Sequence, residues 1–493
     1  MNKPIRTLSI FCLLLFLALM LNATYLQYYR ADGLGDDPRN RRVIEAAFSA
    51  ERGAILVGRE PVAESVESDD QYEWQRTYDQ PFKYAHTTGW FSYFSQTGVE
   101  RSQNDVLSGD DSLLFVTRLA DLLTNASPKG GSVQLTIDQA AQDAAWEGLT
   151  ENPALGSGQI EASVVALEPA TGKILAMVST PSFDPNRLAD HDLRAVAEAA
   201  EELEDAPGQP LLNRAVQTTL PPGSTFKIVT AAAALESGNY SGADALVPGG
   251  DRYQLPLTSG ESNVVTNGGR ACGTDRIPMR QAMEQSCNTT FAALADEVGA
   301  EDMQKQAEAF GWNSRYLEDL PSQAPSRYPD DLDAPQTALA GFGQGSLTAT
   351  PLQMAMVAAG VANGGVVMRP YVVDEVRSPE LDVLEKTEPT ELSRAVSPET
   401  ASALTEMLVS TVSNGTASPA AIPGVQVAGK TGTAQSGVEG QAPYAWFVSF
   451  APADDPQVAV AVMIQRADIP SGEIAGGALG GPIAKRIMEA VIR

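Results

Sequence analysis

Residues 220–235 read Leu-Pro-Pro-Gly-Ser-Thr-Phe-Lys-Ile-Val-Thr-Ala-Ala-Ala-Ala-Leu. Proline and glycine are typical of a turn, and the alanine-rich run predicts a helix from Ser224 to Leu235. Positions i and i+3 share a helix face, so we expect the Lys227 amine to lie towards the Ser224 hydroxyl. A lysine accepts a serine proton only when its pKa falls well below about 10.4, which burial or a nearby cation would achieve. The segment therefore predicts a nucleophile with its base.

Two later segments strengthen this interpretation, because a serine and a lysine can also meet by chance on a surface helix. They are Ser286-Cys287-Asn288 and Gly429-Lys430-Thr431-Gly432-Thr433. Residues 424–431 also match the Walker A pattern, but a phosphate-binding loop needs a helix directly afterwards, and residues 432–437 cannot start a stable one. We therefore predict an edge strand at Lys430, Thr431 and Thr433, whose backbone can pair with an extended peptide.

The order Ser-x-x-Lys, Ser-x-Asn, Lys-Thr-Gly is the signature of penicillin-recognising serine acyltransferases, and the chain resembles the class B penicillin-binding proteins. The resemblance runs from about Arg52 to the C-terminus. Further matching segments are 167–177, 181–186, 341–345, 350–353 and Arg52-Gly53-Ala54-Ile55. Val57 and Gly58 depart from the family, which commonly has an acidic residue and an arginine there.

The resemblance implies a role for each motif residue. Ser224 is the expected nucleophile, Lys227 its base, and Ser286 the residue that relays a proton to the leaving amine. Asn288 is expected to hold the substrate amide. Lys430 with Thr431 and Thr433 is expected to bind the free carboxylate, and Gly432 is a further expected substrate-binding residue. The backbone N–H groups of Ser224 and Thr433 form the expected oxyanion hole, and neither a metal nor a cofactor is expected.

We expect an α+β fold, the penicillin-binding transpeptidase fold, in which helices flank an antiparallel sheet and one subregion is all-helical. Strand-like runs at 163–168 and 173–179, and again at 444–451 and 457–464, predict two hairpins. A sheet built from both ends of this region, with helices packed on it, follows from that order. The predicted helices span 224–235, 279–285, 286–298, 351–362, 398–412 and 481–492.

The N-terminus predicts a membrane anchor. An apolar stretch from Leu8 to Leu26 follows Lys3 and Arg6, and about 20 helical residues span a hydrocarbon core of about 30 Å. The positive residues are expected inside, and the tyrosines that end the stretch at the outer interface. A cleaved signal peptide is the alternative, but the apolar run is long and no clear Ala-x-Ala cleavage site follows.

We divide the chain into a cytoplasmic tail (1–6), a transmembrane anchor (7–28), a non-catalytic pedestal domain (29–158) and a transpeptidase domain (159–493). An acidic linker at 31–38 would follow the anchor. The smaller pedestal is expected to have mixed structure. The predicted location is the cell membrane, with a single span and the catalytic domain outside the cytoplasm.

Composition and the scarcity of histidine exclude several classes of function. A chain of 493 residues with 43% hydrophobic content has room for two or three domains. Its net charge of -28 does not fit a nucleic-acid partner, because phosphate binding depends on clustered lysine and arginine. His86 and His191 are the only histidines and lie in no motif, so neither a Ser-His-Asp triad nor a clustered metal site is expected, and we expect both on the solvated surface. Ser102-Gln103-Asn104 repeats one motif, but it precedes Ser224 and lies in the pedestal.

Cys272 and Cys287 would lie outside the membrane, where thiols tend to be oxidised. A bridge between them would stabilise the fold by about 3 kcal/mol in the chain-entropy account and would restrain Ser286 and Asn288. Two independent apolar thiols are the alternative. Cys12, inside the apolar stretch, is expected to face the membrane.

The predicted function is a peptidoglycan D,D-transpeptidase that cross-links stem peptides through a serine acyl-enzyme and is acylated by β-lactams. The expected partners are stem peptides ending in D-Ala-D-Ala, β-lactams, the membrane, and cell-wall synthesis or division proteins. A D,D-carboxypeptidase or a β-lactamase would use the same motifs with water as acceptor, so both stay open. A non-catalytic sensor or scaffold that binds β-lactams or stem peptides is the alternative from a different class.

Overall fold

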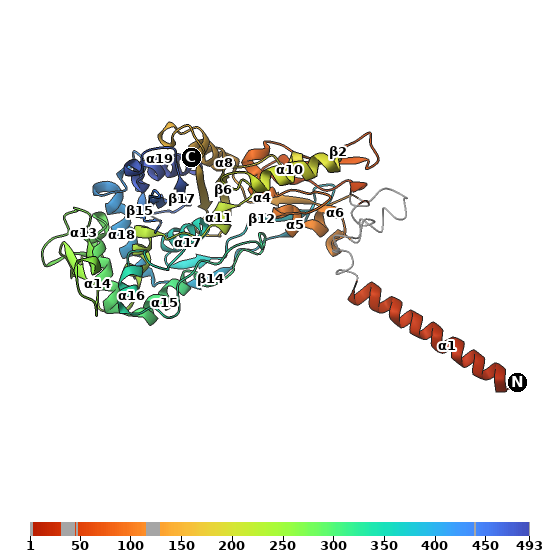
Figure 1. Ribbon diagram of the computed structural model, residues 1–493, viewed down its shortest axis with the longest axis horizontal. Helices are drawn as coiled ribbons and strands as arrows, with labels where there is room; N and C mark the ends of the chain where they lie inside the picture. Colours follow the sequence, from red (N-terminus) through yellow and green to blue (C-terminus); the bar gives the residue numbers. More distant parts are fainter. Residues whose placement is uncertain (1–2, 31–44, 46–47, 115–128, 438–439, 493) are drawn as a thin grey trace.

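The structure of the chain is a computed structural model that describes residues 3–30, 45, 48–114, 129–437 and 440–492. A long helix at the N-terminus projects away from the rest of the molecule (Figure 1). It is α1 (Lys3–Thr24), continued by a π-helical turn, Tyr25–Tyr29. Together these 27 residues are long and apolar enough to cross a membrane, and an 18-residue window within them has a mean hydropathy of 2.2. The predicted linker at 31–38 and the first two residues of the predicted tail lie outside the described residues.

The C-terminal region is built on a five-stranded antiparallel sheet with the order β15-β16-β17-β5-β6. Its strands are β5 (Glu161–Leu167), β6 (Ile174–Thr180), β15 (Ala428–Ala434), β16 (Tyr444–Ala451) and β17 (Val458–Arg466). The two predicted hairpins are therefore confirmed, and they meet where β17 pairs with β5. Strand β15 forms one edge of the sheet. It continues through Lys430 to Ala434, so the Walker A alternative, which needs a helix there, is wrong.

Helices cover both faces of this sheet. On one face α8 (Gln139–Thr150) and α19 (Gly476–Val491) pack against each other and the strands, and on the other lies α17 (Pro351–Ala362). Helix α17 is apolar except for Gln353, whose side chain donates to the carbonyl of Phe310, and it is buried along nearly its entire length, as expected of a helix without a polar face. Helix α19 begins earlier than predicted, because its glycines let the backbone approach the sheet. A Cβ at Gly476 would lie 2.0 Å from the carbonyl oxygen of Trp446.

A helical subregion packs beside the sheet, next to β15 (Figure 1). Its helices are α12 (Lys227–Glu236), α13 (Met279–Glu284), α14 (Asn288–Val298), α15 (Ala300–Ala309), α16 (Ala334–Ala340) and α18 (Pro398–Asn414). The predicted α+β fold with an all-helical subregion is therefore confirmed. Two of these helices start later than predicted: the first begins at Lys227 rather than Ser224, and α14 begins at Asn288 rather than Ser286. The predicted C-terminal ends of α12, α13 and α18 differ by one or two residues.

Shorter elements connect these layers. The helices among them are α9 (Asn186–Ala189), α10 (Leu193–Asp205) and α11 (Arg214–Gln217). The strands are β7 (Leu246–Pro248), β8 (Arg252–Gln254), β9 (Val264–Thr266), β10 (Arg276–Pro278), β11 (Val366–Met368) and β14 (Glu391–Arg394), which form three two-stranded sheets.

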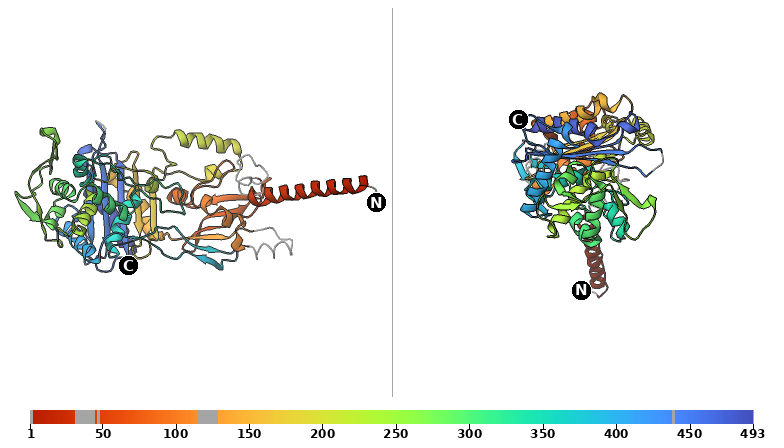
Figure 2. Two further views of the ribbon diagram at one scale, coloured as in Figure 1. Left: turned by 90° about the horizontal axis from the view of Figure 1, so that it is seen from below. Right: turned by 90° about the vertical axis from the view of Figure 1, so that its left-hand side faces the viewer.

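A second sheet, of six strands in the order β13-β12-β4-β1-β2-β3, lies nearer to α1 (Figure 2). Its strands are β1 (Ile55–Val57), β2 (Glu60–Glu67), β3 (Trp74–Tyr78), β4 (Ser132–Leu135), β12 (Val373–Arg377) and β13 (Val383–Lys386). Strands β12 and β13 come from far beyond the predicted boundary at 158/159, and β12 pairs antiparallel with β4. Conversely, α8 precedes that boundary but packs on α19 and β6. The boundary therefore does not divide the chain into two separate structures.

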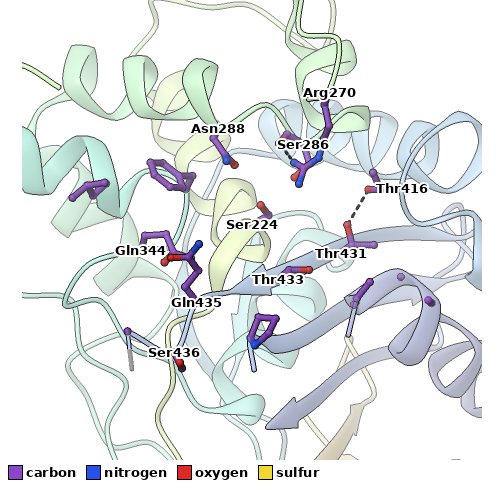
Figure 3. Close-up of a pocket in the computed structure, with 18 of the residues that line it drawn as sticks. Ser224, Arg270, Ser286, Asn288, Gln344, Thr416, Thr431, Thr433, Gln435 and Ser436 are labelled. Carbon is purple, nitrogen blue, oxygen red and sulfur yellow. Dashed lines mark hydrogen bonds between the residues drawn. The ribbon is translucent and has the colours of Figure 1, made fainter. Parts of the chain in front are cut away.

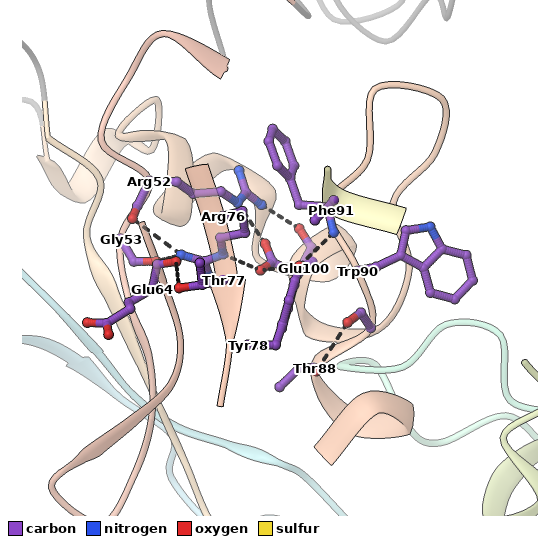
Figure 4. A network of polar contacts seen from close by, with 12 residues as sticks. Arg52, Gly53, Glu64, Arg76, Thr77, Tyr78, Thr88, Trp90, Phe91 and Glu100 are labelled. Carbon is purple, nitrogen blue, oxygen red and sulfur yellow. Dashed lines mark hydrogen bonds and ion pairs between the residues drawn. The ribbon is translucent and has the colours of Figure 1, made fainter. Parts of the chain in front are cut away.

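A buried ionic cluster holds the N-terminal part together (Figure 4). Glu100, on α5 (Gly98–Ser102), is 0% exposed and accepts hydrogen bonds from Nε of Arg52 and of Arg76, both at 2.7 Å. The Tyr78 hydroxyl donates to the same carboxylate at 3.1 Å, and the Arg52 guanidinium lies 4.4 Å from the centre of the Phe91 ring. Burial acts to raise the pKa of Glu100, but the two arginines outweigh it and the pKa is lowered. Two further short helices, α4 (Pro81–Thr88) and α6 (Asn104–Ser108), complete this part.

Candidate active site

Ser224 lies in a tight turn that precedes α12. Residues Gly223–Phe226 form a 3-10 helix, and the Thr225 hydroxyl closes it by donating to the carbonyl of Pro222 at 2.7 Å. The N–H of Gly223 donates to the carbonyl of Gly343 at 3.0 Å. Gly343 has φ +78°, and a Cβ there would lie 1.9 Å from the Gly223 carbonyl oxygen, so only glycine fits. The turn that carries the serine is thus fixed from both sides.

Ser286 occupies the joint between α13 and α14. Its N–H donates to the carbonyl of Met283, and the N–H of Cys287 donates to that of Ala282, which is the Schellman pattern that ends a helix. The position after such a helix is left-handed and favours glycine, yet here Ser286 has φ +54°. This conformation directs both its carbonyl and its hydroxyl towards the lysines described below. Asn288 then starts α14 one residue after Cys287.

Strand β15 runs directly against the turn of Ser224. A Cβ at Gly223 would lie 3.1 Å from the carbonyl oxygen of Thr433, and one at Gly432 would lie 2.9 Å from that of Pro222. At Gly432 a Cβ would clash with the turn, and Gly223 has φ +55°, which favours glycine. Gly432 thus has a structural reason in addition to its predicted place in the binding site. Thr431 and Thr433 lie on the same face of the strand, and both line the cleft beside Ser224 (Figure 3).

The two motif lysines are both fully buried, and both contact Ser286. Nζ of Lys227 donates to the Ser286 carbonyl at 2.7 Å, to Oδ1 of Asn288 at 2.8 Å and lies 3.2 Å from the Ser286 hydroxyl. Nζ of Lys430 donates to the same hydroxyl at 2.8 Å. The expected contact between Lys227 and the Ser224 hydroxyl is not among the hydrogen bonds of the described residues. Lys227 therefore faces Ser286 and Asn288 rather than the serine one turn before it.

The surroundings favour loss of a proton from these amines. Burial, Lys430 and Arg270 together hold the pKa of Lys227 well below its usual value. Burial and Arg270 lower the pKa of Lys430 to about 7. An uncharged Lys227 has two N–H groups for the Ser286 carbonyl and for Asn288, which leaves its lone pair for the Ser286 hydroxyl. The hydroxyl of Ser286 thus connects the two amines.

These residues surround a cleft of about 1100 Å³. Of the predicted residues, the cleft is lined by Ser224, Ser286, Asn288, Thr431 and Thr433. The structure adds cleft residues that the sequence did not single out as a site: Arg270, Leu339, Phe342, Gln344, Thr416, Gln435, Ser436 and the segment 475–478. The hydroxyl groups of Thr416 and Thr431 are 2.9 Å apart (Figure 3).

Cys272 and Cys287 form a disulfide, so the alternative of two separate thiols is wrong. The bond links the loop that carries Arg270 to the residue between Ser286 and Asn288. This link is the signal that could have pointed to Arg270, which lies two residues before the first cysteine. Nothing comparable marks Thr416 in the sequence.

The residues that sequence analysis set aside have structural roles, although the surface location expected for the histidines is wrong. His86 is buried, its Nε2 lies 2.8 Å from the carbonyl oxygen of Pro210, and burial lowers its pKa to about 4. His191 contacts the carboxylate of Asp70, and its side chain is only 8% exposed. Asn104, from the repeated motif in the pedestal, accepts a hydrogen bond from Arg52. None of them lines the cleft.

Comparison with known proteins agrees with this geometry. The family described as penicillin binding protein transpeptidase domain matches residues 162–489. The chain belongs to this family. The family described as penicillin binding protein A dimerisation domain matches residues 52–133, which include β1 to β3 and the Glu100 cluster.

Relatives that match the whole chain show which members of the family it resembles. The peptidoglycan D,D-transpeptidase PbpA of Mycolicibacterium smegmatis is 41% identical over 100% of this chain and 99% of its own length, and that of Mycobacterium tuberculosis is 40% identical with the same coverage. The structure is similar to that of the ceftriaxone acyl-enzyme complex of penicillin-binding protein A from M. tuberculosis, with a TM-score of 0.84 and 39% identity over 91% of this chain and 100% of that one. From its motifs and its three cysteines, the sequence also resembles penicillin-binding protein A of actinobacteria. This resemblance is confirmed by these relatives.

Proposed function

We propose that this chain is a peptidoglycan D,D-transpeptidase that works through a serine acyl-enzyme. The observation that carries the proposal is the arrangement of the three motifs: Ser224 faces the cleft, and the two buried lysines meet at Ser286 behind it. The M. tuberculosis relative, with which the chain shares its fold, is described as an acyl-enzyme with ceftriaxone. A serine flanked by a proton acceptor and an edge strand suits acyl transfer from a peptide.

In the acylation step, Oγ of Ser224 attacks the carbonyl carbon of the penultimate D-alanine. Its proton passes to Lys227, which burial and the neighbouring cations keep uncharged, so that its lone pair is free to accept the proton. For this transfer the Lys227 amine turns from Ser286 towards Ser224, a contact that a bound substrate would complete. The oxyanion would lie between the N–H groups of Ser224 and Thr433, and one such donor contributes on the order of 3 kcal/mol.

Departure of the terminal D-alanine requires a proton on its amine. Ser286 is the proposed relay, because its hydroxyl contacts both lysine amines. Asn288 would hold the peptide amide. The charged form of Lys430, with Thr431 and Thr433, would bind the terminal carboxylate, and Gly432 lets the strand approach closely enough to do so. An amine from a neighbouring stem then attacks the ester, releases Ser224 and forms the cross-link.

The acceptor separates this proposal from its alternatives. A D,D-carboxypeptidase or a β-lactamase would release the acyl group to water, and a sensor or scaffold would not release it. The apolar helix α1 and the N-terminal sheet favour a transpeptidase that acts on a polymer near a membrane. We propose that α1 spans the cell membrane once, with the tail inside and the domains at 29–158 and 159–493 outside. Stem peptides and β-lactams would be its ligands, and other cell-wall synthesis or division proteins its partners.

Labelling with a fluorescent penicillin, followed by intact mass, tests the nucleophile. We expect one penicilloyl group on the wild type and none on Ser224→Ala. The matched control is Ser182→Ala, because Ser182 is a half-buried serine that donates to the carbonyl of Phe82 and does not line the cleft. A label that persists on Ser224→Ala would refute the assignment. Incubation with a stem-peptide donor and an amine acceptor then separates the reactions, because a transpeptidase gives the new amide whereas a carboxypeptidase gives only the shortened peptide.

A further inference from the structure

Three cationic side chains converge on Ser286. Its carbonyl accepts hydrogen bonds from Nζ of Lys227 and from Nη1 of Arg270, each at 2.7 Å. Its hydroxyl contacts Nζ of Lys430 as well as that of Lys227. Because both groups donate to the same carbonyl oxygen, Nη1 of Arg270 and Nζ of Lys227 lie no further apart than twice this hydrogen-bond length of 2.7 Å. Like charges this close destabilise each other's protonated forms.

The position of Arg270 is fixed by its own loop. Two residues further on, Cys272 is bonded to Cys287, the neighbour of Ser286. On the other side, the N–H of Arg270 donates to the carbonyl of Asn267, whose buried side chain accepts from the N–H of Thr289 at 3.0 Å. The guanidinium therefore reaches the cleft from a loop attached at both ends to the helix that follows Ser286 (Figure 3).

Within the described part of the chain, carboxylates do not offset this positive charge. Among the described residues, none contributes to the pKa of Lys227 or Lys430. Five acids of the surrounding helices are engaged elsewhere, in the pairs Glu236 with Ser397, Glu284 with Ser410, Asp296 with Tyr253, Glu297 with Tyr240 and Glu406 with Arg280. A further acid, Glu399 in the first turn of α18, is exposed. The acids of the neighbouring loops, Asp251 and Asp275, are exposed. The charge of the site therefore depends on the three cations alone.

We propose that Arg270 is a positioning residue for acyl transfer, whose permanent charge acts through the Ser286 carbonyl to keep Lys227 uncharged before the substrate binds. A guanidinium does not lose its proton in proteins, whereas a lysine amine does. Of the three cations, the arginine keeps its charge at every pH at which the enzyme is assayed, whereas each lysine can lose its charge. The inference rests on the proposed function, because it assigns the charge state of the proposed base.

The sign of the effect follows directly. The presence of Arg270 lowers the pKa of both lysines, so its removal raises both. A higher pKa leaves less uncharged Lys227 at a given pH, and the rate of acylation falls on the acid side. It also keeps Lys430 charged to higher pH. The whole pH profile of acylation should therefore move to higher pH, by on the order of one unit for a partly solvated charge at this distance.

The experiment measures the second-order rate constant of acylation by a fluorescent penicillin from pH 5 to pH 10 on the full chain. Wild type and Ser224→Ala come first. If the wild type is not labelled, or Ser224→Ala is labelled, the proposed function fails before Arg270 is tested. The variants are then Arg270→Gln, which removes the charge, and Arg270→Lys, which keeps it because position 270 is exposed, unlike the buried Lys227 and Lys430. Arg252→Gln is the matched control, because Arg252 is an exposed arginine of the same subregion that pairs with Glu261.

We expect Arg270→Gln to be slowed about tenfold one unit below the wild-type midpoint and to recover at higher pH. Arg270→Lys and Arg252→Gln should keep the wild-type midpoint. If Arg270→Gln is not acylated at all while Arg270→Lys keeps the wild-type pH profile, the result also supports the proposal. Equal slowing of the Gln and Lys variants at an unchanged midpoint would overturn it. A weaker apparent affinity for the penicillin at an unchanged midpoint would do so too, because the guanidinium would then bind the ligand carboxylate itself.

Discussion

Replacement of Glu100 by glutamine should loosen the N-terminal sheet without touching the cleft. The carboxylate is fully buried, accepts from Arg52, Arg76 and Tyr78, and is the counter-charge for both arginines. Breaking a buried pair leaves uncompensated charge and costs about 3–5 kcal/mol. Glutamine keeps the shape and one acceptor, so we expect the lower end of that range. The matched control is Glu198→Gln, whose pair with Arg194 is exposed, with a cost of at most about 1 kcal/mol.

Hydrogen exchange followed by mass spectrometry measures this effect locally. A loss of about 3 kcal/mol corresponds to roughly 150-fold faster exchange of peptides from β1 and β3, provided they exchange through opening of this sheet. Peptides from β16 and β17 should change little. Unchanged protection of β1 and β3 in Glu100→Gln would refute the reasoning.

The same cluster predicts a dependence on pH. The pKa of Glu100 is lower in the folded chain than the value of about 4.3 in an unfolded one. Its contribution to stability is therefore fully present above that unfolded value and is lost as the pH falls through the folded one. Protection of β1 and β3 in the wild type should decline across that acidic window. Glu100→Gln should lack this part of the decline.

Three further predictions concern the cleft. Gly343→Ala should displace the Ser224 turn and slow penicillin acylation on the order of 10²-fold. Gly364 also has a positive φ but open space around it, so Gly364→Ala should keep the wild-type rate, and equal rates for the two variants would contradict the crowding argument. Loss of the disulfide in the double variant Cys272→Ser, Cys287→Ser should lower the free energy of unfolding by about 3 kcal/mol and the melting temperature with it, whereas Cys12→Ser should change neither. A reductant that leaves the melting temperature of the wild type unchanged would count against a stabilising disulfide. Calorimetry should show that non-covalent binding of an acyl-D-Ala-D-Ala peptide to Ser224→Ala weakens as the pH rises through about 7, because Lys430 loses its charge. A peptide with an amidated C-terminus should show no such dependence, and a flat pH profile for both peptides would exclude carboxylate binding by Lys430.

The sequence predicted the parts of the fold that local rules control. Helix α17 has the predicted bounds because Thr350 caps it and Pro351 suits its first position. Strand β16 also has its predicted bounds, and the edge position of Lys430, Thr431 and Thr433 followed from the absence of a helix after them. The order of the motifs then predicted which side chains meet at one cleft.

Contacts between distant segments explain what the sequence did not predict. The left-handed backbone of Ser286 depends on how α13 ends against α14, and a serine gives no local sign of it. The orientation of Lys227 towards Ser286 rather than Ser224 depends on that same joint. The early start of α19 contradicts the low helix propensity of its glycines, because close packing on Trp446 outweighs propensity. Arg270 has no motif of its own in the sequence, and its place at the site follows from the cleft and from its contact with the Ser286 carbonyl.

The pairing of β12 with β4 has a consequence for engineering. A fragment that stops at residue 158 would lack β12 and β13 and leave β4 without a neighbour on one side. A fragment that starts at 159 would uncover the face of α19 that α8 occupies. Chimeras between relatives should therefore exchange residues 373–386 together with the N-terminal sheet, and leave α8 with the catalytic half. A crossover at a single point in the gene would separate surfaces that fold as one.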